Sequence, residues 1–312
     1  SLSLTAPKMP VVYPTVSPLS CGFLSPPAWK FIADTKEDEK LTMPSMAFLI
    51  QHPASQSNIV FDLSIRKDLT KYHPGLQKHI ETRHPLSSER DVKSALALGA
   101  LDTSEIDYVI MSHVHWDHIG TPSDFPNATF IAGPSTKKLL RNEMGPDLFN
   151  PYFEPALLPP DRTIELPAIP DSEERGDVFD AKHGWYWQTI SLIPNAVDMF
   201  NDGTVYIVNS PGHVPGHLNL LIRIAEEKWV YLAADACHHS RILRGEVDFG
   251  TWKDKKGRMV TIHHDLDAAY NTLDIMRQLQ KIGMDSVPVE VILAHDGEWE
   301  RENARYFFPN HL

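Results

Sequence analysis

Three histidines and one aspartate lie within six residues of this chain, at positions 113–118, where the sequence reads H-V-H-W-D-H. Residues 108–111 (Y-V-I-M) come directly before this run and predict a buried strand. Four metal-binding side chains at the mouth of one strand are too many for a single tetrahedral site on so short a segment. We therefore predict two adjacent metal ions, with His113 and His115 facing one and Asp117 and His118 facing the other.

Later apolar segments, which also predict strands, end in the same kind of side chain. A single histidine after a strand is more often a loop residue than a ligand. Four strand ends that offer seven ligand-type side chains are difficult to explain by chance, and they predict one composite metal site. The three later ligands are His213 beyond residues 205–208, Asp235 after residues 229–234 and His295 after residues 289–294.

Apolar periodicity places the expected strands in two groups, with helices after each group. This pattern predicts an α+β fold in which two sheets pack face to face and helices cover both outer faces. Ser88 is the expected N-cap of the first helix and Gly99 its stop. The expected strands cover residues 46–50, 58–62, 108–112, 128–132, 204–209, 218–224, 229–234 and 289–294, and the expected helices cover residues 88–98, 135–142 and 266–281.

Prolines suggest the domain organisation. Residues 7–27 contain six prolines, so we expect residues 1–45 to form an extended arm over the body of the protein. Residues 46–312 are expected to be a single domain. Within it, residues 146–170 carry seven prolines and no periodicity, which indicates an insertion over about residues 146–190.

Composition restricts the partners and the compartment. The chain has 312 residues and a formal charge of −12, which argues against nucleic acid as a substrate. No apolar stretch reaches the roughly 18 residues that span a bilayer, so no membrane partner is expected. Cys21 and Cys237 are the two cysteines, which indicates no disulfide framework and favours a reducing, cytoplasmic location. The sequence leaves the oligomeric state open.

With these ligands the chain resembles the metallo-β-lactamase superfamily, whose signature is H-x-H-x-D-H followed by distant His, Asp and His. The resemblance covers about residues 46 to 295 and implies an αββα sandwich of two mixed sheets, with the site at one edge of both sheets. Zinc suits such ligands, although Mn, Fe and Co fit the residue types as well. The implied assignment is His113, His115 and His213 to the first metal, Asp117, His118 and His295 to the second, and Asp235 to both.

Two further residues are expected near the metals without binding them. Asp62 resembles the family's aspartate that orients a metal-bound imidazole, and the alternative is an ordinary cap at the end of a strand. His217 is expected to support the ligands. Cys237 is expected to be a packed apolar residue.

Residues 210–221 (S-P-G-H-V-P-G-H-L-N-L-L) look very like the signature of the N-acyl homoserine lactonase branch. Members of that branch carry a tyrosine three residues after the bridging aspartate, whereas this chain carries His238. An imidazole can donate a hydrogen bond or a proton, so we expect His238 to contact the substrate. The alternative is that His238 is a surface residue.

Aromatic side chains outside the ligand segments predict a substrate pocket. Trp185 and Trp187 in the insertion, and Phe249 and Trp252 after the bridging aspartate, are expected to wall an apolar pocket. The alternative for the two insertion tryptophans is that they anchor the insertion to the body.

These expectations combine into a di-zinc hydrolase that opens a small cyclic ester, of the acyl homoserine lactone type known in quorum quenching, with a hydroxide shared by the metals. Asp117, Asp235 and His238 are the expected catalytic groups, and Asp117 or His238 would protonate the leaving group. One alternative is a γ-lactamase or cyclic carbamate hydrolase that detoxifies an aromatic-fused ring such as benzoxazolinone. A remote alternative is a non-catalytic metal-binding protein. The lactone is preferred because an alkoxide leaves more readily than an amide nitrogen.

Overall fold

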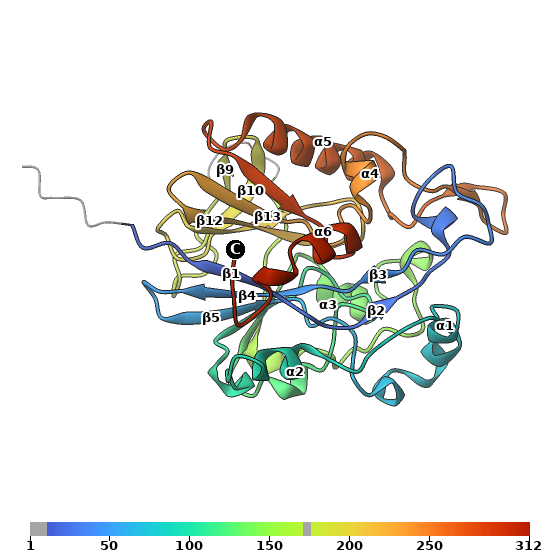
Figure 1. The fold of residues 1–312 in the computed structure, drawn as a ribbon, viewed down its shortest axis with the longest axis horizontal. Helices are drawn as coiled ribbons and strands as arrows, with labels where there is room; N and C mark the ends of the chain where they lie inside the picture. Colours follow the sequence, from blue (N-terminus) through green and yellow to red (C-terminus); the bar gives the residue numbers. More distant parts are fainter. Residues whose placement is uncertain (1–10, 171–175) are drawn as a thin grey trace, which may run out of the picture.

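Two six-stranded sheets lie face to face in the computed structural model, which describes residues 11–170 and 176–312 (Figure 1). In the first sheet, antiparallel pairing at one edge gives way to three parallel pairs. Its strands, in spatial order, are β1 (Thr15–Leu19), β4 (Ala47–His52), β5 (Ser57–Phe61), β6 (Tyr108–Ile110), β7 (Thr129–Ala132) and β8 (Thr163–Glu165).

The second sheet is antiparallel except for its pair β13 and β16. Its strands, in spatial order, are β16 (Val289–Ile292), β13 (Lys228–Leu232), β12 (Leu218–Ala225), β11 (Val205–Asn209), β10 (Ile193–Asp198) and β9 (Gln188–Ile190). Two small hairpin-like pairs complete the strands: β2 (Phe23–Leu24) with β3 (Met43–Pro44), and β14 (Trp252–Lys253) with β15 (Met259–Val260).

Helices cover both outer faces, as Figure 1 shows with α5 above the second sheet and α1 and α2 below the first. In α5, Ala269, Leu273 and Met276 are buried against the second sheet at the 3–4 spacing expected for an amphipathic helix. The helices are α1 (Gln77–Glu81), α2 (Val92–Ala97), α3 (Thr136–Leu140), α4 (Ser240–Leu243), α5 (Leu266–Ile282) and α6 (Gly297–Glu302).

The period-2 alternation of the strands explains why three apolar cores form. In β4, Phe48 and Ile50 point into the core between the sheets, whereas Ala47 and Leu49 point toward the helices below. A third core lies between the second sheet and α5. The αββα layering predicted from the sequence is therefore confirmed.

The helix predicted over residues 88–98 is shorter than expected. It begins at Val92, because the carboxylate of Asp91 accepts the backbone N–H of Ser94 at 2.9 Å and caps the helix. Ser88, the predicted N-cap, instead donates its hydroxyl to the backbone oxygen of Lys67.

The proline-rich segments contribute more regular structure than their composition suggests. Residues 15–19 of the predicted arm pair with β4 as an edge strand, and the predicted insertion supplies the edge strands β8 and β9. Proline is tolerated at a sheet edge because an edge strand has one side free of partners. The parts of the arm and insertion at residues 1–10 and 171–175 lie outside the described residues. The domain boundaries stay a prediction.

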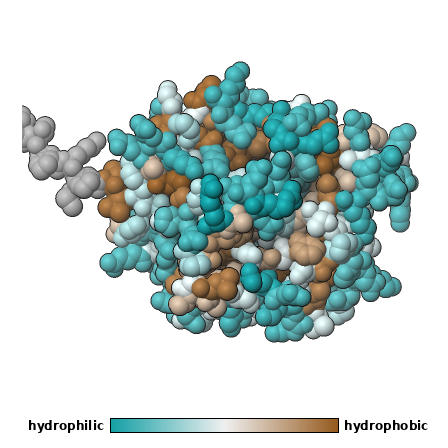
Figure 2. Space-filling model, viewed as in Figure 1, coloured by the Kyte–Doolittle hydropathy of each residue, from teal (hydrophilic) through white to brown (hydrophobic). Residues whose placement is uncertain are grey.

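The surface agrees with this internal placement of apolar side chains. On the face drawn in Figure 2, hydrophilic residues predominate, and hydrophobic ones show in small separate areas. None of the helices in the described part of the chain is both long enough and apolar enough to cross a bilayer.

Candidate metal centre

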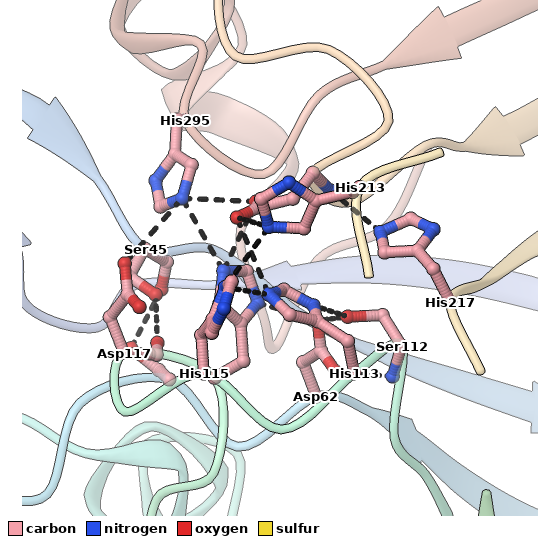
Figure 3. A network of polar contacts seen from close by, with 12 residues as sticks. Ser45, Asp62, Ser112, His113, His115, Asp117, His213, His217 and His295 are labelled. Atoms are coloured by element: carbon pink, nitrogen blue, oxygen red, sulfur yellow. Dashed lines mark hydrogen bonds and ion pairs between the residues drawn. The ribbon is translucent and has the colours of Figure 1, made fainter. Parts of the chain in front are cut away.

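The seven predicted ligands meet at one edge of the two sheets, where β6, β11, β13 and β16 end. Figure 3 shows labelled members of this cluster pointing toward one another. The six-residue run follows β6 in the first sheet, and the three later ligands follow strands of the second sheet. His118 and His295, 177 positions apart in the sequence, are neighbours here because strand ends of both sheets face the same edge.

A first group consists of His113, His115 and His213 around one oxygen of Asp235. Nδ1 of His115 lies 3.0 Å from Nε2 of His113 and 3.0 Å from Nε2 of His213. Oδ2 of Asp235 lies 3.5 Å and 3.4 Å from the same two Nε2 atoms. Three ring nitrogens and one carboxylate oxygen converge in the manner of a four-ligand metal site.

A second group consists of Asp117, His118 and His295 around the other oxygen of Asp235. Oδ1 of Asp235 lies 3.1 Å from Nε2 of His118 and 3.1 Å from Nε2 of His295. Oδ2 of Asp117 lies 3.7 Å from Nε2 of His295. Asp235 therefore presents one oxygen to each group, as a ligand shared by two metals would.

Contacts behind the ligands decide which ring nitrogens face the centre. Nδ1 of His118 lies 2.8 Å from Oδ2 of Asp62, and Nδ1 of His295 lies 2.6 Å from the backbone oxygen of Pro44. Both oxygens only accept hydrogen bonds, so each Nδ1 carries its proton and donates. In the neutral rings the two Nε2 atoms, 3.3 Å apart, then turn lone pairs toward each other and toward Asp235.

The donor set fits divalent metal ions. Oδ1 of Asp235 is buried without a hydrogen bond among the described residues, although it is surrounded by imidazole nitrogens. Converging lone pairs repel one another unless a cation lies between them. Imidazole and carboxylate ligands of this kind suit zinc and the neighbouring divalent metals. The seven residues could therefore hold two such ions.

The protonation equilibria support the same interpretation. Burial holds the pKa of His113 and of His213 well below the ordinary value, so both rings are neutral and able to bind metal. Burial also lowers the pKa of His118, but the carboxylates of Asp235 and Asp62 outweigh it and raise that pKa well above its usual range. The carboxylates thus favour a positive charge on His118 itself, and a metal cation at its Nε2 would take the place of the added proton.

Two residues expected near the ligands lie behind them. Asp62 follows β5 and accepts the backbone N–H of Ser112 at 2.7 Å while it holds His118. His217 accepts the backbone N–H of Asp235 at 3.3 Å, and burial lowers its pKa to about 3. Cys237 is buried, and burial raises the pKa of its thiol to about 12.

His238 lies at the centre and is buried. Its Nε2 is 3.0 Å from Oδ2 of Asp235, and its ring stacks on that of His295 at 5.6 Å. His263 was not singled out by its sequence, yet its ring lies 5.5 Å from His238 and 5.2 Å from His213. The adjacent His263 and His264, directly after the short apolar stretch 259–262 (M-V-T-I), were the available signal.

A cavity of about 360 Å³ opens beside the metal centre. Trp252 lines it, as the sequence predicted. Apolar and aromatic side chains make up much of its wall, and many of its polar side chains gather on the floor at the metal centre. The wall includes Leu24, Phe31, Met43, Leu76, Trp116, Tyr152 and Ile262, and the ligands His115, Asp117, His213, Asp235 and His295 together with His238 form its floor.

The other three predicted substrate contacts lie elsewhere, which corrects their placement. Trp185 and Trp187 are 1% and 3% exposed in the core between the sheets, where their Nε1 atoms donate to the backbone oxygens of Met199 and Pro167. They anchor the insertion to the body instead of walling the pocket. Phe249 is buried against the ring of His263 at 4.4 Å and does not line the cavity.

Comparison with known proteins decides the family. The sequence profile of the metallo-beta-lactamase superfamily matches residues 80–280. The chain belongs to this superfamily. The seven converging side chains fit the metal centre that the resemblance to this superfamily implied.

Individual characterised proteins resemble the chain over different lengths. It is 27% identical over 279 residues to the cytochrome P450 monooxygenase mpaDE of Penicillium roqueforti, a match that covers 82% of the chain and 30% of that protein. It is 29% identical over 223 residues to the γ-lactamase FDB1 of Fusarium pseudograminearum, which covers 64% of the chain and 47% of that protein. The chain thus spans less than half of either relative.

A solved structure shares the fold. The Bacillus thuringiensis protein AiiA, in a variant crystallised with N-decanoyl-L-homoserine at its active site, superimposes with a TM-score of 0.67 at 17% identity. The match covers 97% of this chain and 100% of AiiA. At this identity the likeness establishes the fold alone.

Proposed function

We propose that the chain is a di-zinc hydrolase that opens a small cyclic ester. The observation that carries this proposal is the position of Asp235, whose two carboxylate oxygens face two separate groups of imidazoles. A shared carboxylate sets two metals at the short spacing used for hydrolysis of carbonyl compounds.

The residues around the cavity can bind the metals, orient the ligands and contact the substrate. Two zinc ions held by the seven ligands would supply Lewis acidity toward the ester carbonyl and toward water. Asp62 and the backbone oxygen of Pro44 fix the rings of His118 and His295, so the ligands are oriented before substrate arrives. The apolar part of the cavity wall offers a surface for the ring of the substrate.

Two side chains on the cavity floor can deliver a proton to the leaving oxygen. Asp117 faces the cavity beside His295, and His238 faces it beside Asp235. In the neutral ring Nε2 of His238 carries the proton and donates to Asp235, while Nδ1 is buried without a hydrogen bond in the described part of the chain. His238 therefore also holds the shared carboxylate in position, a task that a tyrosine hydroxyl there could perform by a similar hydrogen bond. To serve as the donor, either His238 or Asp117 would first take up the proton that the attacking water loses.

A γ-lactam or cyclic carbamate fused to an aromatic ring is the second candidate substrate. The similarity to γ-lactamase FDB1 favours it, as do the aromatic side chains of Phe31, Trp116 and Trp252 around the cavity. An aromatic ring delocalises charge on the departing nitrogen and so removes part of the difference between amide and ester.

Hydrolysis of a matched pair tests the proposal. Zinc-loaded protein is given an acyl homoserine lactone and benzoxazolinone, and ring opening is followed together with zinc content per chain. Faster opening of the lactone and about two zinc ions per chain support the cyclic-ester hydrolase. Faster opening of benzoxazolinone supports the second candidate. If zinc-loaded protein opens neither ring and hydrolyses none of a panel of strained esters, the result would support the alternative that the chain is a non-catalytic metal-binding protein.

A further inference from the structure

Two cationic side chains stand in the cavity wall without an acidic partner. Arg83, in the turn after α1, is 9% exposed and lines the cavity, as does Lys30 at the end of the short helix Ala28–Lys30. Within residues 11–170 and 176–312, neither forms an ion pair with a carboxylate. The cavity therefore holds two cations that make no direct ion pair within the described residues, and Asp117, which also lines it, attracts Arg83 only at longer range.

The contacts of Arg83 leave most of its hydrogen-bonding capacity unused. Nη1 donates to the hydroxyl of Thr82 at 3.0 Å, and the described residues offer the guanidinium no further hydrogen bond. A guanidinium presents five N–H donors in a fixed fork that matches a carboxylate. By contrast, the guanidinium of Arg66 makes a bidentate contact, since Nη1 and Nη2 donate to the two oxygens of Glu154 at 2.9 and 3.1 Å.

Lys30 is held beside Arg83 by aromatic rings and not by an acid. Its ammonium lies 5.3 Å from the ring centre of Trp29 and 5.6 Å from that of Trp252. Both side chains line the same cavity. Burial, and next the charge of Arg83, lower the pKa of Lys30.

Several arginines of the described residues contact a carboxylate, whereas the two cations in the cavity wall do not. The sequence has 41 acidic against 29 basic residues, and exposed arginines such as Arg141 find a carboxylate, here Glu143 at 2.7 Å. A charge removed from water without a partner is costly, so unpaired cations in a cavity indicate an anion supplied from outside. Because these cations share the cavity with the metal centre, that anion belongs to the bound substrate.

We propose that Arg83, assisted by Lys30, binds a carboxylate substituent of the substrate, so that this enzyme selects lactones that carry an acid group on an apolar or aromatic body. This inference rests on the proposed hydrolase function. The aromatic and aliphatic cavity wall receives the body of the substrate, the metal centre receives its ester carbonyl, and the carboxylate lies against Arg83.

A pair of probes that differ only in charge tests the inference. Phthalide-5-carboxylic acid and phthalide-5-carboxamide have the same ring and nearly the same shape. Binding to zinc-loaded protein is followed by tryptophan fluorescence, since Trp252 lines the cavity, and ring opening is followed separately. We expect the wild-type protein to bind the acid at least tenfold more tightly than the amide, with a similar preference in kcat/KM.

Variants assign that preference to the two cations. Arg83→Gln should reduce the preference for the acid to less than threefold, mainly through Kd and KM, and Lys30→Met should reduce it by a smaller factor. Arg141→Gln removes one exposed arginine that does not line the cavity and should keep the full preference. If Arg83→Gln does not fold, Lys30→Met and the wild-type comparison carry the test.

Each outcome separates this inference from the proposed function. Equal binding of acid and amide by the wild-type protein, or an undiminished preference in Arg83→Gln, overturns the carboxylate site whether or not the ring opens. Tighter binding of the acid without opening of either ring supports the carboxylate site and counts against the cyclic-ester hydrolase.

Discussion

Oδ2 of Asp62 lies 2.8 Å from Nδ1 of His118, and Oδ1 of the same carboxylate accepts the backbone N–H of Ser112 at 2.7 Å. One side chain thus joins the end of β5 to both the start and the end of the metal-binding run. It fixes the run on the strand behind it and presents Nε2 of His118 to Asp235.

Asp62→Asn should weaken zinc binding about 10- to 100-fold, because the amide cannot support Nδ1–H of His118 as the carboxylate does. Asparagine keeps the size of the side chain and tolerates the positive φ of 62° at this position. Zinc affinity is measured by competition with a chromophoric chelator. Asp102→Asn, an exposed helix cap, is the control. Unchanged affinity in Asp62→Asn would contradict the role given to this contact.

Removing zinc should lower the thermal stability of the protein. Without metal, the lone pairs of His113, His115 and His213 converge around a buried carboxylate with nothing between them. A ligand present at 100 times its Kd stabilises the folded state by about 2.7 kcal/mol. Thermal unfolding with chelator, and again after zinc is restored, measures the effect. A Tm that does not respond to zinc would argue against a metal site here.

Trp185→Phe should cost stability and leave substrate affinity unchanged. The change leaves the buried backbone oxygen of Met199 without its donor, which costs about 1 to 3 kcal/mol. Trp252→Phe is the matched comparison, because Trp252 lines the cavity and should alter KM instead. Urea unfolding and steady-state kinetics on both variants check this. An altered KM in Trp185→Phe alone would restore its predicted contact with substrate.

His79 should make the folded state sensitive to acid. Burial and next the charge of Arg83 lower its pKa to about 4, from an ordinary value near 6.5. Above pH 6.5 the ring is neutral in both states. Between about pH 6.5 and 4 the unfolded chain binds a proton that the folded chain does not, so the free energy of unfolding falls as the pH falls.

The measurement is urea unfolding of wild-type protein and His79→Gln at several pH values, in chelator throughout so that loss of metal does not contribute. Wild-type stability should fall more steeply than that of the variant over this range. Parallel pH profiles would show that His79 titrates alike in both states.

The layered fold could be predicted from the sequence because its central strands are apolar enough to be recognised from the local sequence alone. The edge strands could not. Thr15–Leu19, Thr163–Glu165 and Gln188–Ile190 are short or proline-bearing, and their backbone partners in the sheet decide their conformation. The N-cap of the first helix is Asp91 and not the predicted Ser88 for a related reason. Both residue types can cap a helix, so the local sequence does not distinguish them, and tertiary packing determines which one does so.

The ligands of the candidate metal centre could be recognised in the sequence, because H-x-H-x-D-H and each later ligand follow apolar segments that predict strands. In the structure these strands end at the same edge of the two sheets. Tertiary structure decided which other side chains share that edge. It buried Trp185 between the sheets, brought His263 beside His238, and placed Arg83 and Lys30 in one cavity wall. The local sequence pattern specifies a strand and the residues at its end. A cavity is lined by segments that are distant in the sequence, so its lining depends on how the whole chain packs.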